Sequence, residues 1–338
     1  MKRLLAGSLG PTVGFLALGA LLPALGLDSY TLHLLSMVAI GAILALALQL
    51  LLGWSGQLSI GQAAFYGIGA YAFALVVQAG WGFATGLLSA GAAAMAASLL
   101  MVPITRLKGA YLAVATLGFT IIVYLALKNE EWLTGGAFGL MRIPRWEVLG
   151  FSFKSPAAAF YLNLGILAVV ALAMARLHDS RFGRALLAMQ QNDEAAQACG
   201  ISLTRYKSQT FMIAALVSGI AGALYAHQAG YLNPNDFGFM KSMEILIMVV
   251  IGGVASLEGA ILGALVVVLF PEYMRALDDY RMLLYGVVLV GMMFVGTGGL
   301  ARLLRIATAC LTSAVTNRRG GEATAAAALV AREASDAR

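Results

Sequence analysis

Charged residues are scarce in this 338-residue chain, and their scarcity sets the class of protein. Asp, Glu, Lys and Arg make up 11% of the sequence, whereas an ordinary globular domain carries about 25%. Between residues 4 and 105 the sole formal charge is that of Asp28. A surface that faces water needs many more polar side chains. The composition excludes a soluble enzyme, a nucleic-acid-binding domain or a disordered tail for most of the chain, and it predicts a polytopic membrane protein.

Residues that commonly perform chemistry are also few. Two cysteines and three histidines at unrelated positions provide neither a disulfide framework nor a metal site. The sequence contains no Gly-Lys dipeptide, so it has no G-x-x-x-x-G-K-[ST] loop for binding ATP phosphates. No serine is paired with a base as an intramembrane hydrolase requires. We therefore expect no catalytic residues, no metal and no cofactor.

Long apolar runs are what the sequence does contain. A hydrocarbon core about 30 Å thick is crossed by about 20 helical residues. Runs of about that length, bounded by charges or by Pro and Gly, occupy residues 4–25, 31–52, 58–79, 83–104, 110–127, 157–177, 209–229 and 282–299. A further stretch, 244–270, is interrupted by Gly252, Gly253, Ser256, Glu258 and Gly259. That stretch forms either one long span or two short ones.

The distribution of positive charge decides between these alternatives, because cytoplasmic connectors accumulate Lys and Arg. If 244–270 crosses twice, or dips and returns, both termini and the connectors 105–109 and 176–208 are cytoplasmic. Of the 22 Lys and Arg residues, 15 then lie inside, whereas a single crossing divides them 11 to 11. A paired crossing is therefore predicted. Because these residues are spread over connectors, the net charge of +6 does not indicate a nucleic-acid partner.

The predicted fold class is an all-α, polytopic transmembrane helix bundle. It has eight to ten membrane segments, including a broken or re-entrant pair, and both termini are cytoplasmic. Residues 1–306 form the transmembrane domain, with a cytoplasmic connector at 178–208, and residues 307–338 form a flexible cytoplasmic tail. For residues 4–25 a secretory signal peptide is the alternative, but the absence of a clear small-x-small cleavage site favours a retained span.

Polar residues inside two apolar segments are candidates for a translocation pathway. Glycines let helices approach closely, but an amide in a membrane needs a partner or water, so packing explains the glycines of 51–72 better than its glutamines. Non-helical backbone at membrane depth is buried in protein or lines a water-filled cavity, which makes the interrupted 244–270 stretch a second candidate. The pathway candidates are Gly56, Gln57, Ser59, Gly61 and Gln62 in the first segment and Gly252, Gly253, Ser256 and Glu258 in the second.

The carboxylates within the predicted apolar stretches are those of Glu244 and Glu258, in the interrupted stretch. Proton- or sodium-driven carriers usually place such groups within their spans. Glu244 lies near a predicted helix start, where the helix dipole favours a carboxylate. Contact with a substrate ammonium group is the alternative role.

The connector between the sixth and seventh apolar runs contains a predicted helix. Residues 184–198 are rich in helix-forming residues, with an apolar group at Leu186, Leu187 and Met189, and Gly200 is placed to end the helix. Such an amphipathic helix is either a solvated connector or a docking surface for a partner.

Three blocks of sequence together resemble the LivM-type permease subunits of bacterial branched-chain amino acid ABC importers. They are GQLSIGQAAFYGIGAYA at 56–72, RFGRALLAMQQNDEAAQACGI at 181–201 and MEILIMVVIGGVASLEGAILGA at 243–264. The likeness covers about residues 30–300. The second block resembles the Glu-Ala-Ala-x-x-x-Gly signature of ABC permeases, which here falls on Glu194, Ala195, Ala196 and Gly200.

The resemblance implies a transport component of the bacterial inner membrane rather than an enzyme. A second, LivH-like permease subunit would complete the pathway, two cytoplasmic ABC ATPases would bind the connector, and a periplasmic binding protein would deliver an amino acid such as leucine, isoleucine or valine. The residues implied to couple the permease to the ATPases are Arg184, Glu194, Ala195, Ala196 and Gly200. Related urea and short-chain amide permeases share much of the pattern, so they are the alternative, and an ion-coupled carrier or a structural scaffold is more remote.

Overall fold

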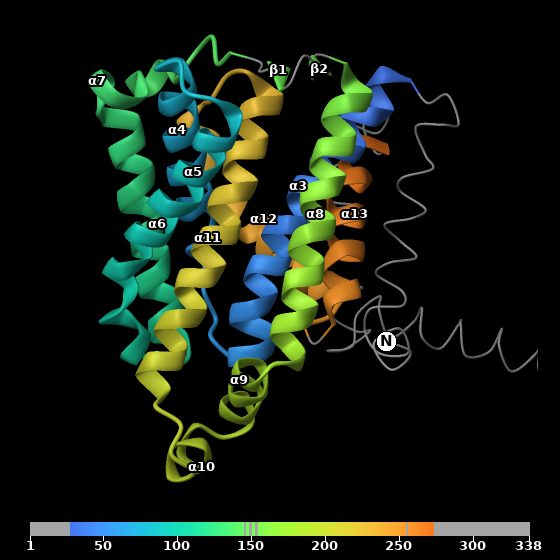
Figure 1. Ribbon diagram of the computed structural model, residues 1–338. Coiled ribbons are helices and arrows are strands. Elements are labelled where there is room, and N and C mark those ends of the chain that lie inside the picture. Colours follow the sequence, from blue (N-terminus) through green and yellow to red (C-terminus); the bar gives the residue numbers. More distant parts are fainter. Residues whose placement is uncertain (1–27, 145–146, 149–150, 153–154, 255, 274–338) are drawn as a thin grey trace, which may run out of the picture.

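The computed structural model describes residues 28–144, 147–148, 151–152, 155–254 and 256–273 (Figure 1). The predicted spans at 4–25 and 282–299 and the predicted tail at 307–338 lie outside these residues.

Five helices among the described residues are long and apolar enough to cross a membrane. The first, Ser29–Trp54, joins α3 (Ser29–Gln49) to the π-helical turn η2 (Leu50–Trp54). The others are α5 (Phe83–Ser98) with the 3-10 turn η3 (Leu99–Met101), α6 (Ala110–Asn129), α8 (Pro156–Asp179) and α11 (Leu203–Ala229). Three shorter helices, α4 (Gln62–Gln78), α12 (Phe239–Gly252) and α13 (Leu257–Tyr273), complete the described bundle.

Short elements connect these helices. They are η4 (Ile104–Arg106), α7 (Glu131–Thr134), η5 (Gly136–Phe138), the paired strands β1 (Glu147–Val148) and β2 (Phe151–Ser152), α9 (Arg181–Gln191), α10 (Asp193–Ala198) and η6 (Pro234–Phe237). Apart from the two-residue strands, the described regular structure is helical, which confirms the predicted class.

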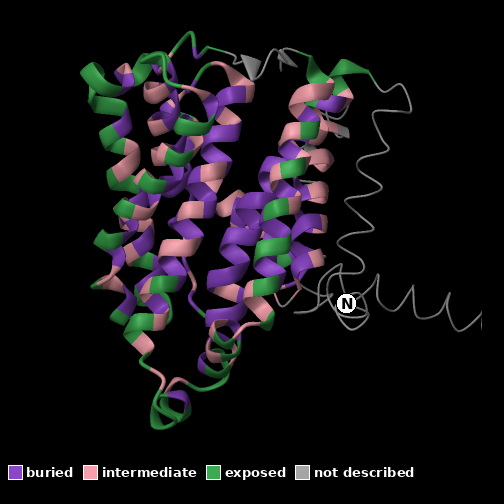
Figure 2. Cartoon of the chain, in the orientation of Figure 1, coloured by how far each residue is buried: buried purple, intermediate pink, exposed green. Residues whose placement is uncertain are grey.

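The helix α3 lies at the centre of the bundle. A helix that is apolar on every side has no face for water and is buried on all sides, and residues 38–51 of α3 and η2 are all buried (Figure 2). The outer helices α6 and α8 expose apolar side chains such as Ile122 and Val169, as helices facing lipid or a second membrane subunit do.

The interrupted stretch forms an antiparallel helical hairpin, as the charge distribution predicts. A Cβ atom on Gly252 would overlap the Gly259 carbonyl oxygen, and one on Gly263 would overlap the Met248 carbonyl oxygen, so the two helices pack with their backbones in contact. At 1.5 Å per residue, α12 and α13 are about 21 and 25 Å long. The hairpin therefore enters and leaves at the same end of the bundle.

The connectors divide between the two ends of the bundle as the sequence predicts. The 105–109 turn, α9 and α10 lie together at the lower end in Figure 1, and β1, β2 and α7 lie at the upper end. That the lower end faces the cytoplasm remains a prediction from the positive charges.

Among the predicted helices whose boundaries differ in the structure, two bear on the candidate site. The predicted span 58–79 is four residues too long at its start, because residues 56–61 are not helical and α4 begins at Gln62. The predicted helix 184–198 is divided at Asn192, which is extended and whose Oδ1 accepts hydrogen bonds from the backbone N–H groups of Glu194 and Ala195. A side chain that caps a new helix in this way ends the preceding one.

Candidate functional site

A non-helical polar segment, residues 56–61, runs from the lower end of the bundle toward its interior (Figure 1). Gly56 has a φ of +65°, which reverses the chain after the π-helical turn, and the Gln57 N–H donates to the Leu51 carbonyl at 2.9 Å. Thr116 Oγ1 accepts from the Ile60 N–H at 3.0 Å, and Thr120 Oγ1 donates to the Ile60 carbonyl at 2.9 Å. Hydroxyl groups of α6 thus replace the helical hydrogen bonds that this backbone lacks.

The predicted pathway side chains of the first block are almost completely enclosed, whereas Gly56 is exposed. Gln57, Ser59 and Gln62 are each 2% exposed or less. The Ser218 hydroxyl of α11 donates to Gln62 Oε1 at 2.6 Å, and Gln57 Nε2 donates to the Ser55 hydroxyl at 2.7 Å. Gly61 immediately precedes α4, and its N–H donates to the Ser59 hydroxyl at 3.2 Å.

The second polar atom of each glutamine has no partner within the described part of the chain. These atoms are Gln57 Oε1 and Gln62 Nε2, and Gln49 Oε1 in α3 is a third. A buried polar group without a hydrogen bond costs about 1–3 kcal/mol, and water or a polar solute removes that cost. The arrangement supports the prediction that these amides face a hydrated pathway.

Residues of the second candidate segment shape the turn of the hairpin. Gly253 has a φ of +113°, which a residue with a side chain rarely adopts. The Ser256 hydroxyl accepts from the Gly259 N–H at 3.2 Å, and Glu258 lies in the first turn of α13. Close packing accounts for Gly252, as described above. A structural role is therefore sufficient for Gly252, Gly253 and Ser256.

Glu244 has a partner within its own helix. Its carboxylate lies 3.0 Å from the Lys241 ammonium, and both side chains are about 30% exposed. This pair supports a local structural role for Glu244 over contact with a substrate.

The candidate coupling residues lie on α9, α10 and the turn that follows. The apolar side of α9, with Leu186 and Met189, is buried against the bundle. Arg184 Nη1 donates to the Asp179 carbonyl at the end of α8 at 2.8 Å. On α10, Glu194 and Ala195 are exposed while Ala196 is 4% exposed. Gly200 has a φ of +86° and ends α10, as predicted.

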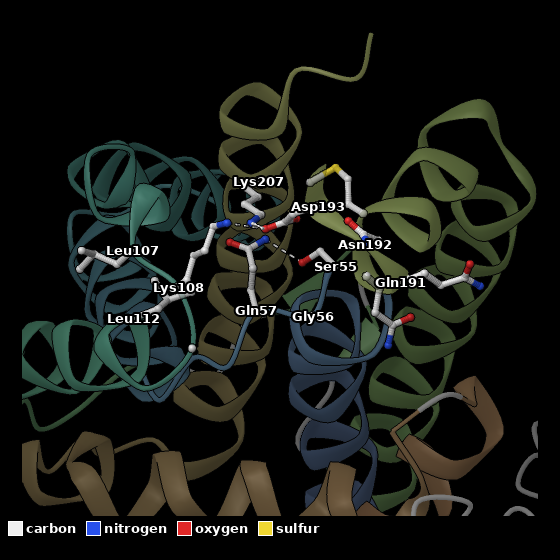
Figure 3. A pocket seen from close by; sticks show the side chains of 13 residues that line it. Ser55, Gly56, Gln57, Leu107, Lys108, Leu112, Gln191, Asn192, Asp193 and Lys207 are labelled. Carbon is white, nitrogen blue, oxygen red and sulfur yellow. Dashed lines mark hydrogen bonds and ion pairs between the residues drawn. The ribbon is translucent and has the colours of Figure 1, made fainter. Parts of the chain in front are cut away.

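A cleft lies between the connector formed by α9 and α10 and the polar segment (Figure 3). A Cβ atom on Gly56 would lie 3.5 Å from Gln190 Cγ, so the polar segment and the connector are in contact. The cleft beside this contact has a volume of about 260 Å³. Its lining residues are Ser55, Gly56, Gln57, Leu107, Lys108, Gly109, Leu112, Met189, Gln190, Gln191, Asn192, Asp193 and Lys207.

Three charged side chains meet in this cleft. Lys207 Nζ donates to Asp193 Oδ2 at 2.7 Å, and Lys108 Nζ lies 4.0 Å from the same oxygen. The Lys207 side chain is 10% exposed, Asp193 22% and Lys108 68%. The cluster ties together three separate elements: α10, the start of α11 and the turn before α6.

Several residues of the site were not predicted from the sequence. Thr116 and Thr120 are four residues apart in α6, so they share one face of that helix, and this spacing was the signal for their shared role. Ser218, Asp193 and Lys207 carried no comparable signal, because their partners are distant in the sequence.

Comparison with known proteins identifies related membrane components. The model of the family described as the branched-chain amino acid transport system permease component matches residues 30–294. The chain is 36% identical over 300 residues to the high-affinity branched-chain amino acid transport system permease protein LivM of Escherichia coli, covering 81% of this chain and 71% of that protein. It is 26% identical over 243 residues to LivH of E. coli, covering 67% and 78%. No solved structure matches.

Proposed function

The chain belongs to the branched-chain amino acid transport system permease family, and we propose that it forms part of the pathway for leucine, isoleucine, valine or a similar amino acid in an ABC importer. It is a multi-pass membrane permease subunit of the bacterial inner membrane. A second, LivH-like permease subunit is its membrane partner. Two cytoplasmic ATPases and a periplasmic binding protein complete the proposed complex, and ATP is hydrolysed in the ATPases rather than in this chain.

The observation that carries the proposal is the contact between the two predicted functional regions. The buried polar segment with Gln57 touches the connector at Gln190, and the charged cleft spans the same contact. A rigid-body movement of α9 and α10, imposed by a partner that hydrolyses ATP, would therefore act directly on the polar segment. The 181–201 connector is the proposed ATPase-binding surface.

Reconstituted transport tests this function. The chain, its LivH-like partner, the two ATPases and the binding protein are placed in proteoliposomes, and uptake of labelled leucine is followed with ATP sealed inside. We expect uptake that requires both ATP and the binding protein. Uptake without ATP, driven by an ion gradient, contradicts an ABC importer. Competition by urea or acetamide, without competition by isoleucine and valine, would assign the chain to an amide permease instead.

Reversing the charge of Glu194 is expected to weaken ATPase binding. The Glu194 side chain is exposed on α10, so Glu194→Lys leaves the bundle folded but changes the proposed docking surface. We expect several-fold less ATPase to co-purify with the permease and a matching loss of ATP-driven uptake, while insertion into the membrane is normal.

The matched control is Glu130→Lys. Glu130 is also an exposed glutamate, and it lies at the opposite end of the bundle, between α6 and α7. This charge reversal should leave ATPase retention unchanged. Equal retention and transport in the Glu194 and Glu130 variants would show that α10 is a solvated connector rather than a docking surface.

A further inference from the structure

The cleft between the polar segment and the connector has two chemically different sides. Lys108, Asp193 and Lys207 supply charges of both signs, while Leu112 and Met189, each 2% exposed, supply apolar surface. A zwitterion with a short apolar side chain has matching parts: a carboxylate, an ammonium group and a hydrocarbon end. Ligand sites typically combine an apolar lining with a few placed polar groups.

Two polar side chains in the cleft, those of Lys108 and Gln57, can each bind a polar group of a ligand. Lys108 is 68% exposed, and its ammonium is 4.0 Å from Asp193 Oδ2, too far for a hydrogen bond. Gln57 lines the cleft, is 2% exposed, and its Oε1 has no partner among the described residues. Figure 3 shows the Gln57 side chain directed toward the cluster of Lys108, Asp193 and Lys207. One cation donor and one buried acceptor are thus available in addition to the existing ion pair.

We propose that this cleft is a release site for an α-amino acid with a short apolar side chain, which it occupies after leaving the polar segment. Lys108 pairs with the carboxylate, and Asp193 and Gln57 Oε1 accept hydrogen bonds from the ammonium group. The apolar side chain lies against Leu112 and Met189. The inference rests on the proposed function for the identity of the solute, and it adds a site and residue roles to it.

The walls of the release site also explain how the solute is expelled. Asp193 belongs to α10, whereas Lys207 belongs to α11 and Lys108 to the turn before α6. A movement of α10 relative to the bundle separates Asp193 from the two lysines and removes the acceptor for the ammonium group. The affinity of the site then falls when the connector moves.

Inhibition by solute inside the vesicle tests the site. In proteoliposomes of the complete complex with ATP inside, preloaded leucine should slow uptake by occupying the cleft. In Lys108→Gln the interior leucine concentration that halves uptake should rise about tenfold, the loss expected for one charge-assisted hydrogen bond. Interior 4-methylpentanoate, which lacks the ammonium group, and 3-methylbutylamine, which lacks the carboxylate, should each inhibit more weakly than leucine.

The control is Arg106→Gln, which removes one exposed positive charge from the same turn outside the cleft. This variant should show the inhibition of the unmodified chain. Asp193→Asn should also raise the half-inhibiting concentration, and its thermal stability is measured because Asp193 holds the nearly buried Lys207. If interior leucine inhibits the Lys108 and Arg106 variants equally, or does not inhibit the unmodified complex, the release site is disproved while the import function stands. Absence of ATP-driven leucine uptake in the unmodified complex would instead overturn the proposed function.

Discussion

Replacing Gly222 by alanine is expected to destabilise the bundle by about 1–3 kcal/mol, the usual cost of overpacking a close contact. A Cβ atom at this position of α11 would overlap the Tyr66 carbonyl oxygen and lie 2.7 Å from the Ala70 nitrogen of α4. Both contacts are backbone atoms, which cannot rotate away as a flexible side chain does. We expect a lower thermal unfolding temperature of the purified complex and a reduced yield of assembled permease.

Gly165→Ala in α8 is the matched control for this prediction. Among the described residues, and apart from the backbone of α8 itself, no heavy atom lies within 4 Å of a Cβ atom built on Gly165. Because alanine forms helix better than glycine by about 1 kcal/mol, the same substitution should leave stability unchanged or raise it slightly. If the Gly222 and Gly165 variants unfold at the same temperature, α4 and α11 do not pack with their backbones in contact.

The close approach of these two helices shows what composition could and could not predict. The apolar runs predicted the spans because hydrophobic length alone decides which segments cross a bilayer. Hydrophobic length does not predict which helices pack against each other. Because α3 and α4 are apolar on nearly every side, neither has an apolar stripe that indicates which side faces a neighbouring helix. Gly69 on α4 meets Gly219 on α11, a pairing of residues 150 positions apart that no local pattern encodes.

Part of the candidate site was predicted from the sequence, and the rest was not, because its hydrogen-bond partners lie on other helices. The buried amides of Gln57 and Gln62 were identified because an amide is costly in an apolar segment. Their surroundings depend on other helices: Ser218 lies on α11, and Thr116 lies on α6. The turn between the hairpin helices was predicted from its glycines, whereas the helix break at Asn192 was missed, although an Asn followed by Asp and Glu is a local signal for the start of a new helix.

The hairpin contacts the chain on both sides of the polar segment: the end of α3 with η2, and the start of α4. A Cβ atom on Gly53, in the π-helical turn before the polar segment, would overlap the Val254 carbonyl oxygen in the hairpin turn. Gln49 Nε2 donates a hydrogen bond to the same carbonyl. Farther along, the Ser242 hydroxyl accepts from the Ala63 N–H at 3.2 Å. The helices α4 and α12, which carry parts of the first and third sequence blocks, are therefore in direct contact, and π-helical turns of this kind are frequent at functional sites.

Gly53→Ala should accordingly reduce transport more than a substitution elsewhere on α3. The added methyl group displaces the Val254 carbonyl or the Gln49 amide, and an overpacking cost of about 1–3 kcal/mol is enough to change the ratio of the native arrangement to a displaced one about tenfold. The measurement is ATP-driven leucine uptake by the assembled complex, normalised to the amount of folded permease. Gly41→Ala is the control, because its nearest neighbours are the flexible Met248 side chain and Val268 Cγ2, each at 3.4 Å. Since Gly41 faces the same hairpin from the same helix, equal uptake by the two variants would mean that the contact between Gly53 and Val254 has no part in transport.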